Sequence, residues 1–214
     1  MSKTLGILGA GHLGIQIAHL AISDNHFEKI VFFDDYSKAQ KIADYEIIGS
    51  SNEVIPKFKE KKFDQLIIAI GYKHLKKREY FYTMFRESVP FATLIHSSNF
   101  IDPTAIIAEG CVLYPFSCID QRVQIKPNTI VNLNCTIAHD TTIGSHCFLS
   151  PSVAIAGFCA IGDQNFIGIN TTIIDSIETC KSVVTGGGSV VVKNIISSGI
   201  YVGNPAKKIK DDTI

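Results

Sequence analysis

An imidazole and a carboxylate stand side by side in the chain at His139 and Asp140. Imidazole changes its protonation state near neutral pH, and a neighbouring carboxylate favours a basic imidazole through charge and hydrogen bonding. Such a pair can act as a general base that removes a proton from a nucleophile. The alternative is that both are ordinary polar residues on the protein surface. The choice depends on where the fold places His139.

A second candidate is the glycine-rich segment GAGHLG at residues 9–14, which follows an apolar run and opens a helix-like run. Glycines let the backbone approach a phosphate, and a helix N-terminus favours negative charge. Asp34 and Asp35 end the next strand-like run, where a dinucleotide site places its ribose-binding acid. The short sheet expected here lacks a second mononucleotide half, so a nucleotide-sugar diphosphate fits better than NAD. A tight turn without a ligand is the alternative.

The elements that position these residues divide the chain into two parts. Residues 1–98 alternate short β-branched runs with helix-like segments, which is typical of βαβ units on a parallel sheet. Predicted strands cover residues 4–8, 29–33, 65–70 and 91–95. Predicted helices cover residues 12–22, 53–61 and 73–87. We therefore expect an α/β, Rossmann-like N-terminal domain.

From Ile101 onward the sequence has a period of six. An aliphatic residue recurs at every sixth position through thirteen hexads, from Ile101 to Ile173, and the residue four places after it is small or β-branched. This period fits neither an α-helix nor a plain strand. It is typical of a parallel β-helix, in which three hexads complete one triangular coil. After Ile173 we expect the phase to slip through residues 175–182 and to resume at Val184 and Val190, with a loop at one corner.

The repeat also assigns positions to the reactive side chains. Four of the six cysteines, Cys111, Cys135, Cys147 and Cys159, occupy the small slot, so we expect buried hydrophobic residues and not ligands or nucleophiles. No CxxC pair is present, which argues against a zinc ribbon or a thioredoxin motif. His139 occupies the third position of its hexad, near a corner, from which its side chain can project outward.

Composition excludes several classes of protein. The 214 residues include 20 Lys+Arg and 20 Asp+Glu, so the formal net charge is zero. The chain therefore lacks the electrostatic footprint of a protein that binds nucleic acid or anionic membrane. No apolar run approaches the roughly 20 residues of a membrane-spanning helix, and the N-terminal sequence lacks the features of a signal peptide. We expect a cytoplasmic protein with neither nucleic-acid nor membrane partners.

The hexapeptide repeat and the closing segment YVGNPAKK at residues 201–208 resemble the hexapeptide-repeat acyltransferases. GAGHLG, the FFDD strand end and the segment NLNCTIAHDTTIG more narrowly resemble the nucleotide-sugar N-acetyltransferases of the bacillosamine and perosamine pathways and the sialic acid O-acetyltransferase group. The resemblance covers nearly the whole chain. It implies a Rossmann-like, nucleotide-sugar-binding domain at residues 1–98. A left-handed parallel β-helix at residues 99–214 would bind acetyl-CoA, catalyse the reaction and end in a C-terminal tail.

The same resemblance implies roles for individual residues. His139 would be the general base, and Asp140 would raise its basicity. The implied substrate-binding residues are Ala10, Gly11, His12, Asp34, Asp35 and Gly71. The implied acetyl-CoA-binding residues are Gly157, Ile169 and Gly187. Lys207 and Lys208 could in addition contact phosphates of acetyl-CoA, and the alternative for this pair is a solvated tail. The family's second site histidine falls at Phe148 in this sequence, which is a departure, and no metal is implied.

The resemblance implies transfer of the acetyl group of acetyl-CoA to the amine of a nucleotide-linked amino-deoxy sugar of the 4-amino-4,6-dideoxy type, for surface polysaccharide or glycan synthesis. His139 would take the proton, and a backbone N–H such as that of Gly157 would stabilise the oxyanion. The superfamily's habit implies a homotrimer. Two alternatives remain. One is O-acetylation of a sugar hydroxyl, as on sialic acid, and the other is a non-catalytic β-helix that serves as a binding module.

Overall fold

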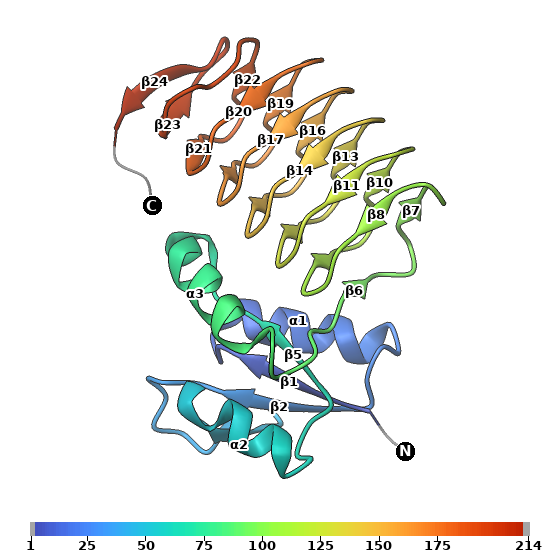
Figure 1. The fold of residues 1–214 in the computed structure, drawn as a ribbon, viewed down its shortest axis with the longest axis vertical. Coiled ribbons are helices and arrows are strands. Elements are labelled where there is room, and N and C mark those ends of the chain that lie inside the picture. The colour runs from blue at the N-terminus through green and yellow to red at the C-terminus, as the bar shows by residue number, and fades with distance from the viewer. Residues whose placement is uncertain (1–2, 212–214) are drawn as a thin grey trace. The chain divides into compact units, whose positions relative to one another are not determined.

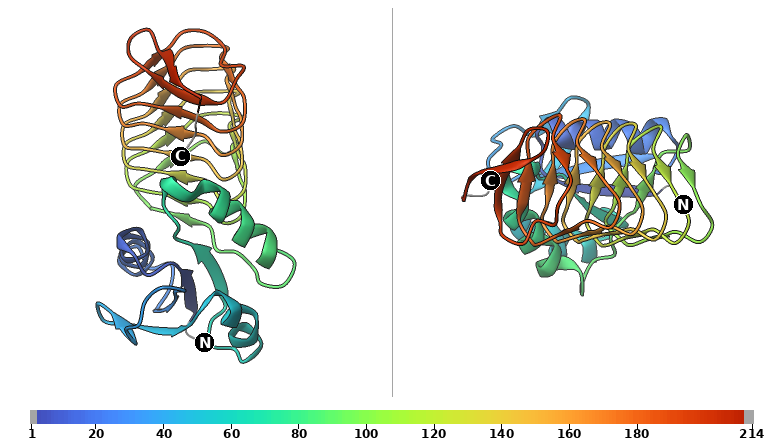
Figure 2. Two further views of the ribbon diagram at one scale, coloured as in Figure 1. Left: turned by 90° about the vertical axis from the view of Figure 1, so that its left-hand side faces the viewer. Right: turned by 90° about the horizontal axis from the view of Figure 1, so that it is seen from above.

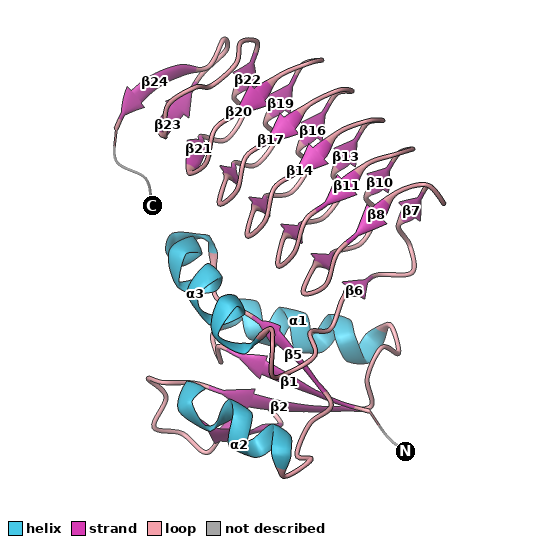
Figure 3. Cartoon of the chain, viewed as in Figure 1, coloured by secondary structure: helices cyan, strands magenta, loops and turns pink. Residues whose placement is uncertain are grey.

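The computed structural model describes residues 3–211 and divides into two compact units between Leu94 and Ile95. The expected boundary was after residue 98. The described helices all belong to the N-terminal unit, as the cyan ribbons of Figure 3 show. They are α1 (His12–Ser23), η1 (Ser51–Glu53), α2 (Val54–Lys59), η2 (Tyr72–His74) and α3 (Leu75–Phe85), of which η1 and η2 are 3₁₀ turns.

The N-terminal unit is built on a five-stranded sheet with the order β3-β4-β2-β1-β5. Its strands are β1 (Thr4–Leu8), β2 (Lys29–Phe33), β3 (Lys41–Ile42), β4 (Tyr45–Gly49) and β5 (Gln65–Ile68). All neighbours are parallel except β3 and β4. Because successive side chains point to opposite faces, Leu8 and Phe33 pack with α2 and α3. Phe32 faces the other way, onto α1 at Gly14. The Rossmann-like α/β fold is confirmed.

The details of this unit differ from the sequence predictions in two places. The hairpin of β3 and β4 was not predicted, because it turns through Ala43 at a φ of 48° and lacks the Asn-Gly or Asp-Gly pair that marks such turns. The expected strand at residues 91–95 is also wrong as a strand of this sheet. Phe91 makes only an isolated bridge to Leu66, and β6 (Leu94–Ile95) belongs to a sheet of the β-helix.

The C-terminal unit is a three-sided parallel β-helix, whose coils repeat along its length in Figure 1 and Figure 2. Sheet I contains β7 (Phe100–Ile101), β10 (Cys118–Ile119), β13 (Thr136–Ile137), β16 (Ala154–Ile155), β19 (Thr172–Ile173) and β22 (Val190–Val191). Sheet II contains β8 (Ile106–Ile107), β11 (Gln124–Ile125), β14 (Thr142–Ile143), β17 (Ala160–Ile161) and β20 (Glu178–Thr179). Sheet III contains β6, β9 (Val112–Leu113), β12 (Ile130–Val131), β15 (Phe148–Leu149), β18 (Phe166–Ile167), β21 (Val183–Thr185), β23 (Gly199–Val202) and β24 (Lys207–Lys210).

The interior of the β-helix is filled as the repeat predicts. The inward aliphatic residues from Leu113 to Ile173 are at most 3% exposed, and the four cysteines of the small slot are at most 2% exposed. Burial raises the pKa of the Cys135 thiol to about 11. These cysteines therefore pack as small hydrophobic side chains.

The predicted phase slip after Ile173 is wrong. Strands β20 and β21 continue the register of β17 and β18 without interruption. Thr179 and Thr185 take the inward positions, because threonine has the β-branched shape of valine and finds partners for its hydroxyl. The oxygen of Thr179 accepts hydrogen bonds from the Gly162 N–H at 3.1 Å and from the Asn165 amide at 2.5 Å.

From Gly110 to Gly188, each corner of the prism turns through the fourth residue of a hexad, which has a positive φ. The φ values of the non-glycine corner residues lie between 55° and 67°. These residues are Phe116, Arg122, Asn128, Asn134, Asp140, His146, Ser152, Phe158, Gln164, Asn170, Ser176 and Ser182. Three hexads make one coil, so residues 18 apart lie one above the other at the same corner.

Candidate active site

His139 lies at the corner between sheets I and II, in the turn from β13 to β14. Its side chain is 39% exposed, so the imidazole projects from the coil and is not sealed inside it. The Nδ1 atom is 2.9 Å from Oδ2 of Asp140. Arg122, at the same corner one coil earlier, grips this carboxylate with two hydrogen bonds, from Nε to Oδ1 at 2.6 Å and from Nη2 to Oδ2 at 2.8 Å.

These contacts set the protonation of the pair. Hydrogen bonds from Arg122 first, and from His139 second, hold the pKa of Asp140 far below its ordinary value. An ionised carboxylate can only accept a hydrogen bond, so Nδ1 of His139 must carry the proton. The neutral imidazole then presents an unprotonated Nε2, which is the arrangement that a general base needs.

In the next coil, Gly157 and Phe158 contact the imidazole of His139. A Cβ atom added to Gly157 would lie 2.8 Å from Cε1 and 3.0 Å from Nε2 of His139, so the ring rests directly on the bare backbone of Gly157. The ring of Phe158 stands edge-on to the imidazole at a centroid distance of 5.0 Å and an angle of 85°. The N–H of Phe158 donates to the carbonyl of His139 at 3.1 Å. His139 and Gly157, to which the resemblance assigned the general base and acetyl-CoA binding, are thus in contact.

Arg122 and Phe158 were missed in the sequence analysis. Both stand 18 residues from Asp140, one before it and one after it. Since a coil contains three hexads, that spacing alone would have placed the three side chains in one column. The repeat length therefore predicts that Arg122, Asp140 and Phe158 lie at one corner.

The N-terminal unit holds a cavity of about 380 Å³. Its wall includes Gly9, Asp34, Asp35 and Gly71, three of which were predicted to bind substrate. Asp34 organises this wall, because its carboxylate accepts backbone hydrogen bonds from Ala10, Tyr36 and Ser37, each at 2.8 Å. Burial alone would raise the pKa of Asp34, but these three donors and the charge of Lys77 bring it below the ordinary value.

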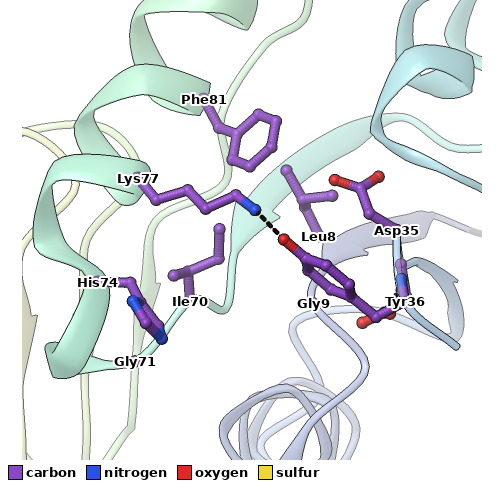
Figure 4. A pocket seen from close by; sticks show the side chains of 10 residues that line it. Leu8, Gly9, Asp35, Tyr36, Ile70, Gly71, His74, Lys77 and Phe81 are labelled. Atoms are coloured by element: carbon purple, nitrogen blue, oxygen red, sulfur yellow. Dashed lines mark hydrogen bonds between the residues drawn. The ribbon is translucent and has the colours of Figure 1, made fainter.

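Tyr36 and Lys77 approach each other across this cavity, as Figure 4 shows. The ammonium group of Lys77 donates to the Tyr36 hydroxyl at 2.6 Å and lies 4.8 Å from the centre of its ring. The hydrogen bond to Tyr36 and the charges of Asp35 and Asp34 raise the pKa of Lys77, against the opposing effect of burial. Both residues were missed, because no spacing rule links the end of β2 to the middle of α3.

The three glycines among residues 9–14 differ in whether the structure requires glycine at their positions. Gly9 has a φ of 112°, and a Cβ on Gly14 would collide with the carbonyl oxygen of Gly9. A Cβ on Gly11 would meet nothing within 4 Å, so the turn itself does not require glycine there. Gly11 is exposed and precedes the first residue of α1, the exposed His12. The space over Gly11 is therefore open to a ligand at the helix N-terminus.

The other predicted cofactor residues lie elsewhere on the β-helix. Ile169 and Gly187 stack at the corner between sheets III and I, where a Cβ on Gly187 would be 3.0 Å from Cγ2 of Ile169. Lys207 lies in the closing hairpin and lines a hollow of about 190 Å³. His146 is buried at the corner between sheets II and III, with Nδ1 3.0 Å from the Asn128 amide, so it does not share the corner of His139.

Among residues 3–211, no group of three or more His, Cys, Asp or Glu side chains is placed to hold a metal ion. The longest helix in the same range has 12 residues, and none of its helices could cross a membrane.

Comparison with known proteins agrees with this architecture. Residues 4–82 match the family described as the PglD N-terminal domain. The chain is 24% identical to GDP-perosamine N-acetyltransferase of Escherichia coli O157:H7 over 215 residues, which span 96% of each chain.

Solved structures extend the similarity to the whole fold. The acetyltransferase domain of PglB from Neisseria gonorrhoeae FA1090, solved with acetyl coenzyme A, matches with a TM-score of 0.89 at 25% identity, over 98% of this chain and all of that one. PerB from Caulobacter crescentus, solved with CoA and GDP-perosamine, matches with a TM-score of 0.87 at 22% identity, over 97% of both chains. The sequence-based recognition agrees with these comparisons: over nearly its whole length the chain is similar to nucleotide-amino-sugar acetyltransferases that have a hexapeptide-repeat domain.

Proposed function

We propose that the protein transfers the acetyl group of acetyl-CoA to the amino group of a nucleotide-linked amino-deoxy sugar of the 4-amino-4,6-dideoxy type. The observation that carries the proposal is the corner where hydrogen bonds link Arg122, Asp140 and Nδ1 of His139, with the imidazole partly exposed. The relative from Escherichia coli O157:H7 that matches over nearly the whole chain is an N-acetyltransferase by name, and the acetyltransferase domain of PglB was solved with acetyl coenzyme A.

In the proposed reaction His139 removes a proton from the sugar amine as the nitrogen attacks the thioester carbonyl carbon. The C–N bond forms and the negative charge moves to the carbonyl oxygen. The C–S bond then breaks, and the departing thiolate takes the proton that Nε2 has held. Asp140 stabilises the imidazolium between these steps, because its carboxylate stays ionised.

A backbone N–H can stabilise the oxyanion of this reaction. The Gly157 N–H is a candidate, because it donates to no group among residues 3–211 and belongs to the residue on which the imidazole rests. The hydrogen bond from the Phe158 N–H to the carbonyl of His139 holds the turn that contains Gly157 in place. The Gly157 N–H is therefore already positioned before the reaction.

The nucleotide diphosphate of the acceptor would bind to the N-terminal unit. The cavity beside Asp35 and Gly71 has a cation, Lys77, at its wall, and the open N-terminus of α1 at Gly11 offers backbone donors to a phosphate. Asp35 has one oxygen committed to the Ser51 N–H at 2.7 Å, which leaves its other oxygen to accept from a sugar hydroxyl. Asp34 acts through Ala10 and the following turn, so we assign it the positioning of the site.

Acetyl-CoA would lie along the β-helix. Gly157 is at one corner of the prism, whereas Ile169 and Gly187 are at another. A homotrimer with closed symmetry would resolve this separation by setting the first corner of one chain against the second corner of the next. Ile169 is 51% exposed, as such a shared groove requires. We infer a cytoplasmic location for the protein, and surface polysaccharide or glycan synthesis as its setting.

The test is a thiol-release assay with acetyl-CoA and a panel of acceptors. Nucleotide-linked 4-amino-4,6-dideoxy sugars carrying UDP, dTDP or GDP are compared with the matching 4-hydroxy sugars and with free sialic acid, and products are identified by mass spectrometry. We expect a gain of one acetyl group on one or more of the amines and none on the hydroxyls. Acetylation of a hydroxyl alone would establish an O-acetyltransferase instead. Failure to bind CoA in calorimetry would establish a non-catalytic module.

A further inference from the structure

Phe158 occupies a backbone conformation that suits it poorly. Its φ is 58°, in the left-handed region that disfavours bulky side chains. Most corner residues with positive φ are Asn, Asp, Ser, Gln or Gly. Glycine and asparagine tolerate this region, and the other three are small or polar residues. Among the described corners, the two phenylalanines with positive φ are Phe158 and Phe116. A strained residue that persists suggests a function for its side chain.

The ring of Phe158 is also poorly covered. The residue is 61% exposed, so burial of its ring does not compensate for the backbone strain. Its one ring contact of note is the edge-on approach to His139 at 5.0 Å. The ring therefore forms an apolar wall next to the general base. Phe158 lies at the same corner as Arg122 and Asp140, one coil after Asp140.

This position constrains any acceptor. The amine must come within hydrogen-bond reach of Nε2, about 3 Å, for proton transfer. The centre of the imidazole is 5.0 Å from the centre of the Phe158 ring, so a sugar ring bound through an atom near Nε2 has this wall within reach. A hexose that lacks the 6-hydroxyl presents a methyl group, which gains from contact with an apolar surface, whereas a hydroxymethyl group must give up water.

We propose that Phe158 is a specificity-determining residue that packs against the apolar side of the acceptor sugar and selects for the 6-deoxy form. This inference rests on the proposed function and deepens it. It assigns the contact to the acceptor and not to acetyl-CoA. Arg122 and Asp140 position the base, and Phe158 positions the molecule from which the base takes the proton.

The test compares the full-length variants Phe158→Asn and Phe158→Tyr with the matched control Phe116→Asn. Asparagine tolerates a positive φ, so neither asparagine variant should lower the Tm. Phe158→Asn should raise the KM for the 6-deoxy acceptor about tenfold or more, the usual effect of a lost apolar contact, and leave the KM for acetyl-CoA within twofold. Phe158→Tyr keeps the ring and should retain wild-type KM values. Phe116 is 69% exposed and lies at the corner of Ile169 and Gly187, so its variant serves as the control for the effect of this substitution on the Tm.

Selectivity provides the second readout. The wild type should prefer the 6-deoxy acceptor over its 6-hydroxy counterpart in kcat/KM, and Phe158→Asn should lose that preference. A rise in the KM for acetyl-CoA instead, a fall in kcat alone with a displaced pH profile, or an unchanged preference would each overturn the assignment. If the wild type acetylates no amino sugar, the proposed function fails, which is a different result from a wild-type-like Phe158→Asn.

Discussion

Gly157→Ala tests whether the seat of the imidazole matters for catalysis. The added Cβ would be 2.8 Å from Cε1 of His139, whereas ordinary van der Waals contact begins near 3.4 Å. The ring must therefore move by at least 0.6 Å, the difference between 3.4 and 2.8 Å. The imidazole is at a partly exposed corner and can yield toward solvent, but any such movement disturbs its 2.9 Å bond to Asp140.

A displacement of about 1 Å in a catalytic group can cost 100-fold in rate. We expect kcat of Gly157→Ala to fall by about 10- to 100-fold in the thiol-release assay, with the Tm changed by less than about 2 °C, because the backbone of Gly157 needs no positive φ. Gly144→Ala is the contrasting control. Its Cβ would lie 2.6 Å from the backbone of Gly162, which cannot yield, so this variant should lose stability.

A second comparison separates the effect on the base from other causes. In the background of His139→Ala, Gly157→Ala should have no further effect on the rate, because the group that it displaces is already absent. Wild-type kcat in Gly157→Ala, or an undiminished effect without the imidazole, would refute the reasoning that the glycine serves to seat His139.

Three other predictions follow from named contacts. Asp140→Asn should shift the acidic limb of the kcat/KM profile to lower pH and reduce the maximum, because removal of the charge destabilises the imidazolium of His139; an unmoved limb would contradict the coupling. Thr179→Val should lower the free energy of unfolding in urea by about 1–3 kcal/mol, since the Asn165 amide loses its buried partner, and Thr179→Ser should lower it less. Lys77→Met should weaken binding of a nucleoside diphosphate about tenfold in calorimetry and reduce its salt dependence, whereas unchanged affinity would remove Lys77 from the site.

The sequence predicted the β-helix well because its signal is periodic and has no competing interpretation. Inward residues such as Ile137 and Ile155 recur at fixed spacing, and the structure pairs them in register. The prediction failed at Thr179 and Thr185, because these two inward residues are not aliphatic and so interrupt the pattern. Its shape and its satisfied hydroxyl let it continue the core.

The candidate site was predicted unevenly for a related reason. His139 and Asp140 are neighbours in sequence, so a local motif identified them. Arg122 acts from one coil away, and Lys77 meets Tyr36 across 41 positions of the chain. The first could have been placed by counting three hexads, but the second depends on how α3 packs on its sheet, which no local pattern specifies.

The role of His139 as the general base is tested most directly by measuring kcat for His139→Ala, with a nucleotide-linked amino sugar and acetyl-CoA both saturating. The side chain is at a partly exposed corner and fills no core position, so the variant should fold and bind acetyl-CoA as the wild type does. We expect kcat to fall by roughly 100-fold or more, the scale of a lost general base. Turnover at the wild-type rate would contradict this role.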